Sequence, residues 1–272
     1  MKKIKITGLL TVVLLIFTAC SGKKNDPNHI VVGITYGPEM EIAVAAQKVA
    51  KEKYNLDVEL IPFNDYVVPN EALNNGDIEA NAFQHVPYLN EQSKQRGYKL
   101  AVVGNTFVYP IVAYSKKIRN ISQLQNGSTI VIPNDPTNEG RSLLLLQKNG
   151  LLKLKEGTGL LPKVTDITEN PKQLKILEIE APQLPRVLDD KEVTIAVINN
   201  NFASQAELDA DKQGVFKEDK DSPYVNVIVA THENKNSAKV KNFVKAYQSD
   251  EVAKKAEEIF KSGAVKGWED QK

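Results

Sequence analysis

The sequence predicts an α/β protein built from two lobes, with a ligand cleft between them. Candidate strands and helices alternate along the chain after residue 30, which favours largely parallel sheets with helices on both faces. This alternation contains too many units for one compact sheet. Polar and aromatic clusters also follow several candidate strands, and the strand ends of α/β sheets point into a ligand crevice. A cleft between lobes is a common site for a small ligand.

The first part of the alternation runs from residue 30 to residue 114. Runs of Val, Ile and aromatic residues predict buried strands, and apolar residues at helical spacing predict helices. Gly76 and Gly97 follow two of these helices as stop signals. The expected strands are 30–34, 58–63, 100–104 and 107–114, and the expected helices are 42–54, 70–75 and 87–96.

The second part repeats the pattern and then returns to the first lobe. Asp135 and Pro136 suit an N-cap and a first helical position, ahead of an apolar run over 143–146. The expected strands are 129–133, 176–179, 193–198 and 224–230, and the expected helices are 121–124, 181–188, 202–211, 238–247 and 252–260.

The expected crossings between the lobes lie near 114–117 and 222–226. They divide the chain into a first lobe of residues 30–114 and 226–272 and a second lobe of residues 115–225. Hinge closure around a bound ligand is a known device of such two-lobed proteins.

The N-terminus has the pattern of an export signal. A basic start of three lysines precedes an apolar run over 6–17, which is too short to span a bilayer but suits a signal peptide. Small residues then precede Cys20, as in a lipobox, although Phe17 stands where Leu is usual. We therefore expect a signal peptide at 1–19 and a lipid-anchored tether at 20–29. A buried cysteine in a globular N-terminus is the alternative.

Composition argues against several classes of function. Lys and Arg number 35 against 34 Asp and Glu, whereas a nucleic-acid-binding surface is strongly basic. One cysteine excludes an intramolecular disulfide and a multi-cysteine metal site. The 3 histidines form no metal-binding motif, and no phosphate loop or nucleophile elbow is present. We expect no catalytic residue, no metal site and no cofactor.

The polar clusters that follow the strands could bind a zwitterion with an apolar tail. Arg141 lies near a predicted helix N-terminus and could pair with a carboxylate. Asn side chains can accept from an ammonium group and donate to a carboxylate. Tyr66, Phe83 and His85 could form the wall around the tail, since aromatic edges favour a thioether sulfur. The clusters are 63–66, 79–85, 133–141, 198–201 and 224–226.

Each of these residues also has an ordinary structural interpretation. Phe83 could belong to the core, Tyr66 to an exposed turn, and Arg141 to a solvated helix face. Asn200 and Asn201 could be turn formers.

Long segments carry a resemblance to a known family. They are FNDYVVPNEALNNGDIEANAFQHVPYL (63–89), GNTFVYPI (104–111), VIPNDPTNEGRSLLLLQ (131–147), LEIEAPQLPR (177–186), VINNNFASQ (197–205) and AYQSDEVAKKAEEIFKSGAVKGW (246–268). They are distributed along the chain from residue 63 to residue 268. The chain thereby resembles the NlpA family of substrate-binding lipoproteins.

The resemblance implies a two-lobed periplasmic-binding-protein fold with the ligand in the interlobe cleft. It implies capture of L-methionine and delivery to an ABC importer, which consists of a membrane permease and a cytoplasmic ATPase. The expected protein is a monomer in the cell envelope, facing outside the cytoplasm and held at a membrane by the lipid on Cys20.

The resemblance also implies roles for individual residues. Arg141 is expected to pair with the ligand carboxylate. Asn199 and Asn226 are expected to hold the amino-acid head. Tyr66, Phe83 and His85 are expected to line the side-chain pocket.

Other functions remain open on the sequence alone. The same fold could bind D-methionine, a Met-containing dipeptide or another apolar amino acid. An enzyme on this fold would need a positioned acid or base, for which His85 is the obvious candidate. A surface lipoprotein with no transport role is the third alternative.

Overall fold

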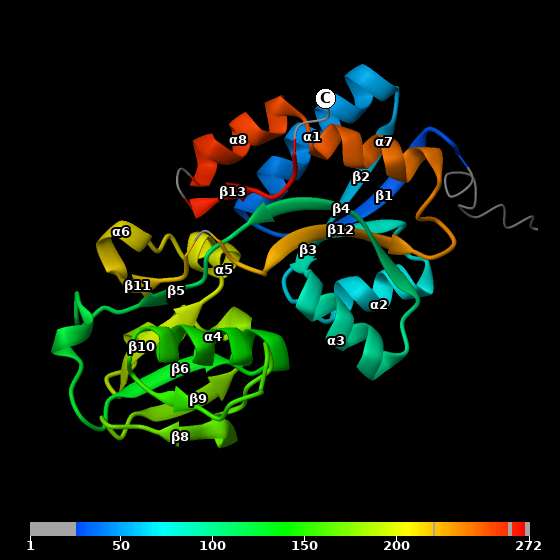
Figure 1. The fold of residues 1–272 in the computed structure, drawn as a ribbon. Coiled ribbons are helices and arrows are strands. Elements are labelled where there is room, and N and C mark those ends of the chain that lie inside the picture. The colour runs from blue at the N-terminus through cyan, green and yellow to red at the C-terminus, as the bar shows by residue number, and fades with distance from the viewer. Residues whose placement is uncertain (1–25, 220, 261–262, 270–272) are drawn as a thin grey trace, which may run out of the picture.

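Two β-sheets form the frame of the protein in the computed structural model, which describes residues 26–219, 221–260 and 263–269 (Figure 1). Within these residues the first sheet has six strands, in the order β13 (Val265–Lys266), β4 (Leu100–Val108), β12 (Val225–Thr231), β3 (Ala80–His85), β1 (His29–Thr35) and β2 (Asp57–Phe63). The second has five, in the order β11 (Gly214–Lys217), β5 (Val112–Tyr114), β10 (Val193–Ile198), β6 (Thr129–Pro133) and β9 (Lys175–Ile179). A short pair, β7 (Lys153–Leu154) and β8 (Ile167–Glu169), lies apart from them.

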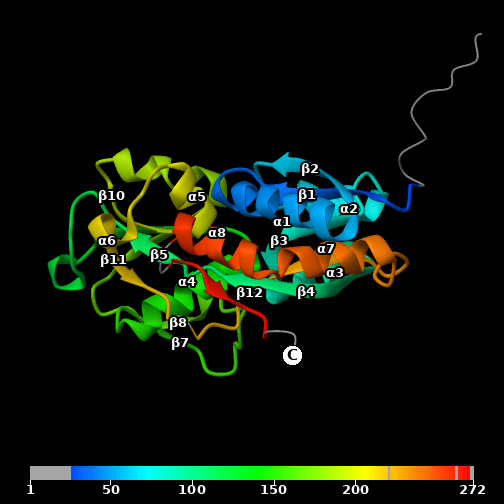
Figure 2. The same cartoon turned by 90° about the horizontal axis from the view of Figure 1, so that it is seen from above.

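Helices cover both faces of the first sheet. One face carries α1 (Pro38–Tyr54), α7 (Ala238–Tyr247) and α8 (Asp250–Phe260), which lie together over the sheet (Figure 2), and the other carries α2 (Val68–Asn75) and α3 (Val86–Arg96). Successive residues of β12 alternate between the two layers: Ile228 packs with α1 and α7, whereas Val227 and Val229 pack with α2 and α3. The central part of the strand, residues 227–230, is therefore apolar, as both of its faces are buried.

The second sheet is enclosed in the same way. On one face lies α4 (Pro136–Lys148), and on the other lie the 3₁₀ turns η3 (Ala181–Gln183) and η4 (Arg186–Asp189) with α5 (Asn200–Gln205). On β6, Ile130 and Ile132 pack with α4, whereas Val131 packs with Leu184 and Phe202 on the opposite face. The remaining short elements are η1 (Ile121–Gln123), η2 (Val164–Asp166) and α6 (Ala210–Gln213).

The helix ends follow the capping signals in the sequence. Asp135 caps α4 by accepting a hydrogen bond from the backbone N–H of Asn138, and Pro136 takes the first helical position. Gly76 and Gly97 end α2 and α3 with positive φ angles of 75° and 72°. These left-handed conformations favour glycine, which has no Cβ.

Both sheets are mixed, so the expectation of largely parallel sheets is wrong. β2, β1 and β3 are parallel neighbours, as are β9, β6 and β10. The strands next to the crossings, β4, β12, β5 and β11, pair antiparallel. A chain that returns from the other lobe enters its sheet from the opposite end, and this reverses the strand direction.

The chain passes between the sheets twice. The first crossing lies between β4 and β5, so residues 112–114 pair in the second sheet rather than in the first lobe, where the sequence pattern placed them. The strand expected over 107–114 is therefore broken, and Pro110 lies in the break. The second crossing lies between β11 and β12, and Val225, expected at the end of the second lobe, begins β12.

Two expected helices are shorter than the pattern suggested. The segment 181–188 forms η3 and η4 because Pro182 and Pro185 lack the N–H donors of a continuous helix. The segment 202–211 divides into α5 and α6, separated at Glu207, which has a left-handed φ of 55°.

The predicted signal peptide at 1–19, Cys20 and most of the tether lie outside the described residues. Across the ranges that the structure does describe, no helix combines the length and the apolar character needed to span a bilayer.

We expect two substitutions on α1 to differ sharply in their effect on stability. Ile42 has no exposed surface, whereas Val44, two residues further on the same helix, is 47% exposed. Ile42→Ala should lower the free energy of unfolding by about 2–5 kcal/mol, because it removes buried methyl groups and leaves a cavity. Val44→Ala should change it by less than about 0.5 kcal/mol. Urea unfolding measures both, and equal effects would contradict this packing.

Candidate ligand-binding site

A cleft between the two lobes is lined by side chains from both of them. The structure brings every predicted binding residue to its walls. They are Tyr66, Phe83, His85, Arg141, Asn199 and Asn226. The first lobe contributes Tyr66 from the loop after β2, together with residues of β3 and β12, and the second lobe contributes residues from α4 and from the end of β10.

Aromatic rings form the wall on the side of the first lobe. The Tyr66 ring lies 6.0 Å from the Phe83 ring and 6.0 Å from the Tyr88 ring, measured between centroids. Phe83 lies at an irregularity in the pairing of β3 with β12, where Val227 pairs with Gln84 but Ile228 pairs with Ala82. A β-bulge of this kind re-aims a side chain and is frequent beside functional sites.

The strand β3 was not predicted, although it is central in the first sheet. All of its residues are buried, including two amides that break the apolar pattern expected of a strand. Asn70 and Gln84 exchange hydrogen bonds of 2.8 and 2.6 Å, and Asn81 donates to Asn70 over 3.0 Å. This satisfied network allows polar residues in the core, behind the aromatic wall.

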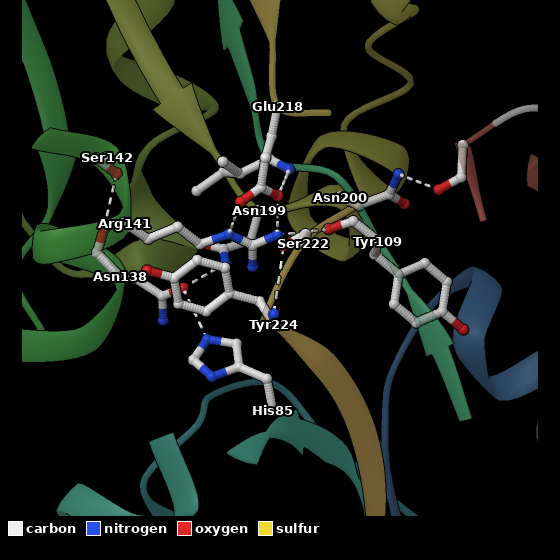
Figure 3. Close-up of polar contacts among 12 residues, drawn as sticks. His85, Tyr109, Asn138, Arg141, Ser142, Asn199, Asn200, Glu218, Ser222 and Tyr224 are labelled. Carbon is white, nitrogen blue, oxygen red and sulfur yellow. Dashed lines mark hydrogen bonds and ion pairs between the residues drawn. The ribbon is translucent and has the colours of Figure 1, made fainter. Parts of the chain in front are cut away.

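His85 joins the first lobe to the second. Its Nδ1 accepts from the backbone N–H of Tyr88 at 3.1 Å, and its Nε2 lies 3.4 Å from Asn138 Oδ1 (Figure 3). Burial, together with the charge of Arg141, lowers the pKa of His85 to about 3. The ring is therefore neutral at pH 7, with its proton on Nε2 and directed toward Asn138.

Tyr66 makes a second link between the lobes. Its hydroxyl donates to Asn201 Oδ1 at 2.5 Å, and its ring lies 5.0 Å from that of Phe202. Burial raises the pKa of Tyr66 well above its ordinary value, so the hydroxyl remains a donor.

Arg141 is a buried cation that is paired within the protein. Its side chain is 4% exposed, and its Nε and Nη2 donate to both carboxylate oxygens of Glu218. Nη2 also donates to the carbonyl of Tyr109 at 2.9 Å, and the guanidinium lies 4.4 Å from the centre of the Tyr224 ring (Figure 3). Within the described chain these hydrogen bonds use Nε and Nη2, which leaves Nη1 for a further acceptor.

The asparagines supply unpaired polar atoms. Asn199 donates through Nδ2 to Asn138 Oδ1 at 2.9 Å, while its buried Oδ1 has no hydrogen-bond partner among the described residues. Asn201 Nδ2 is also buried and has no hydrogen-bond partner among the described residues. Asn226 donates to the carbonyl of Phe83 at 3.3 Å and pairs with His85 in the sheet. Buried polar groups normally have partners, so unpaired ones in a cleft point to a polar ligand.

Glu39 also lines the cleft and was missed by the sequence analysis. The residue is 5% exposed, and its carboxyl group accepts from Thr35 Oγ1 at 3.1 Å. Burial raises the pKa of Glu39 to about 8, against a smaller lowering by the Thr35 hydrogen bond. The group is therefore mostly neutral at pH 7. Its position in the first turn of α1, the helix that follows β1, agrees with the same strand-end rule that identified the other clusters.

The arrangement suits a small zwitterion with an apolar tail. Arg141 Nη1 can donate to a carboxylate, Asn199 Oδ1 can accept from an ammonium group, and the aromatic wall can bury a tail. Across the described residues, no group of three or more His, Cys, Asp or Glu side chains could hold a metal ion.

Comparison with known proteins identifies relatives over almost the whole chain. The family described as NlpA lipoprotein matches residues 30–268. The D-methionine-binding lipoprotein MetQ of Escherichia coli (strain K12) is 63% identical over 254 residues, which are 93% of this chain and 94% of that protein.

Two solved structures have the same fold. A nutrient binding protein from Burkholderia cenocepacia bound to methionine aligns with a TM-score of 0.85 and 49% identity, over 88% of this chain and 100% of that one. An ABC transporter periplasmic substrate-binding protein from Coxiella burnetii aligns with a TM-score of 0.84 and 44% identity, over 88% of this chain and 100% of that one. This chain thus has the fold of periplasmic substrate-binding proteins, and it belongs to the NlpA lipoprotein family.

Proposed function

We propose that this protein is an extracytoplasmic lipoprotein that binds L-methionine in its interlobe cleft and delivers it to an ABC importer. The observation that carries the proposal is the combination of a buried guanidinium, an unpaired amide oxygen and an aromatic wall in one cleft. The relative from Burkholderia cenocepacia, which is bound to methionine, and the transporter-associated relative from Coxiella burnetii support the same ligand and role.

The proposed binding mode assigns one part of the ligand to each group. Arg141 Nη1 pairs with the carboxylate, while Asn199 and Asn226 hold the amino-acid head. The thioether tail lies against Tyr66, Phe83 and His85, where sulfur–aromatic contacts contribute about 0.3–1.5 kcal/mol each.

Ligand identification tests this function directly. Methionine released from the purified protein by denaturation should be detectable by mass spectrometry, and chiral chromatography should assign its enantiomer. The printed name of the Escherichia coli relative specifies D-methionine, so calorimetry with both enantiomers is the matched comparison. A dipeptide or another apolar amino acid in the released fraction would replace methionine as the ligand.

The transport role has its own test. The proposed partners are a membrane permease and a cytoplasmic ATPase, and the proposed state is a monomer tethered through Cys20. Deletion of the gene should reduce methionine uptake by cells. Unchanged uptake would favour a surface lipoprotein without a transport role.

An enzymatic role has less support. His85 is the obvious acid or base candidate, but both of its ring nitrogens are engaged and its pKa is lowered to about 3. A base with that pKa has little proton affinity at pH 7. Incubation with methionine should therefore give no converted product.

Arg141→Ala should weaken methionine binding strongly. Loss of one partner of a buried ion pair typically costs about 3–5 kcal/mol, and here it would also leave Glu218 without its ion-pair partner. The double variant Arg141→Ala/Glu218→Gln also removes the unpaired charge of Glu218, and Glu218→Gln alone is its matched control. Calorimetry should show methionine binding by Glu218→Gln and a large loss in the double variant. Similar affinities for the two would exclude Arg141 as the carboxylate partner.

The cleft should discriminate among amino acids by the shape and polarity of the tail. Norleucine and leucine should bind about ten- to several-hundred-fold more weakly than methionine, because a lost sulfur contact or methylene in an apolar pocket is worth about 1–3 kcal/mol. Methionine sulfoxide should be rejected more firmly, since both ring nitrogens of His85 are occupied and none is free to bind the sulfoxide oxygen. Competition against labelled methionine measures this order. Equal competition by isoleucine or glutamate would contradict the proposed pocket.

Cys20→Ala should abolish lipid attachment. Cys20 follows an apolar export segment and two small residues, as a lipidated cysteine does. Cells grown with labelled palmitate should incorporate the label into the wild-type protein and not into the variant. A labelled variant would show that the lipid is attached elsewhere.

A further inference from the structure

A chain of side-chain amides leads from Asp135 to the unpaired oxygen of Asn199. Asp135 accepts from the backbone N–H of Asn138 at 3.0 Å, and its two oxygens lie 3.1 and 2.9 Å from Asn138 Nδ2. An ionised carboxylate can only accept hydrogen bonds. The amide of Asn138 must therefore turn its nitrogen toward Asp135 and its oxygen away from it.

The direction of the Asn138 amide determines that of the next one. Asn138 Oδ1 lies 2.9 Å from Asn199 Nδ2 and 3.4 Å from His85 Nε2. An amide oxygen can only accept, so both neighbours must present donors. His85 does so, because its Nδ1 already accepts from the backbone N–H of Tyr88 and its ring is neutral.

The result is a defined acceptor in the cleft. With its nitrogen held by Asn138, Asn199 presents Oδ1, which is buried and has no partner within the described part of the chain. We propose that Asp135 and Asn138 are positioning residues, which orient the Asn199 amide so that its oxygen accepts from the amino group of the ligand. This inference rests on the proposed function. It explains why the cleft selects ligands that carry an amino group, whatever their tail.

The carboxylate of Asp135 also caps α4, and the two roles can be separated. Asn serves at an N-cap about as well as Asp, because both supply the side-chain oxygen that accepts from the backbone. In Asp135→Asn the cap can persist, but the second carboxylate oxygen becomes an NH₂ group. Asn138 would then turn its oxygen toward residue 135, and Asn199 would turn its nitrogen into the cleft, where it would oppose an ammonium group.

Two ligands distinguish orientation from general damage. Methionine carries the amino group, whereas 4-(methylsulfanyl)butanoate has the same carboxylate and tail without it. The ratio of their affinities is the amino-group preference, measured by competition against labelled methionine. Asp209→Asn is the matched control, since Asp209 caps α6 through the backbone N–H groups of Asp211 and Lys212 and does not line the cleft.

We expect Asp135→Asn to weaken methionine binding at least about tenfold, the scale of one misdirected buried hydrogen bond, and to leave binding of the analogue unchanged. Asp209→Asn should leave both affinities unchanged. The double variant Asp135→Asn/Asn199→Asp should regain the amino-group preference, because a carboxylate presents an acceptor whichever way it is turned.

Equal weakening of both ligands by Asp135→Asn would show a purely structural role and overturn the inference. An unchanged amino-group preference, or failure of Asn199→Asp to restore it, would do the same. Failure of the wild-type protein to bind methionine would instead overturn the proposed function, and this inference with it.

Discussion

The buried guanidinium of Arg141 is the interaction on which the arrangement of the two lobes depends. It contacts both segments that connect the sheets, through the carbonyl of Tyr109 and the carboxylate of Glu218. Those segments also bind each other, because the backbone N–H of Glu218 donates to Ile111 at 3.0 Å. A charge buried to this extent is stable only while its partners surround it, so helix α4 and both crossings are held together. A ligand carboxylate on Nη1 would therefore bind at the point where the lobes are joined.

The polarity of the cleft comes from directed hydrogen bonds more than from charge. His85 of the first lobe contacts Asn138 of the second, and Tyr66 of the first lobe donates to Asn201 of the second. The site is therefore complete only when both lobes contribute to it. Burial shifts the pKa values of His85 and Glu39 in opposite directions, to about 3 and about 8, and both side chains are mainly neutral at pH 7. The amides then provide orientation, and Arg141, paired with Glu218, provides the Nη1 donor.

Much of the fold could be predicted because the signals are local. Capping residues and apolar runs predicted β6, β10 and α7 with the same bounds that the structure has, and Gly76 and Gly97 marked the ends of α2 and α3. The strand β3 was missed because its amides are satisfied by Asn70, a partner on another element that no local pattern reveals. The helix expected over 181–188 failed for a local reason, since its prolines outweighed its apolar spacing.

The sequence by itself determined the lobed α/β architecture and the chemical types of residue at the strand ends, because burial and capping depend on near neighbours. It also marked Arg141, Asn199 and the aromatic residues as members of one candidate site. Only the tertiary structure decided that Arg141 pairs with Glu218, that the first crossing precedes residue 112, and that the Asn199 oxygen is left unpaired. These outcomes depend on hydrogen-bond directions and ion pairs between residues far apart in the chain, such as Asn138 and Asn199, and sequence spacing carries no information about those directions.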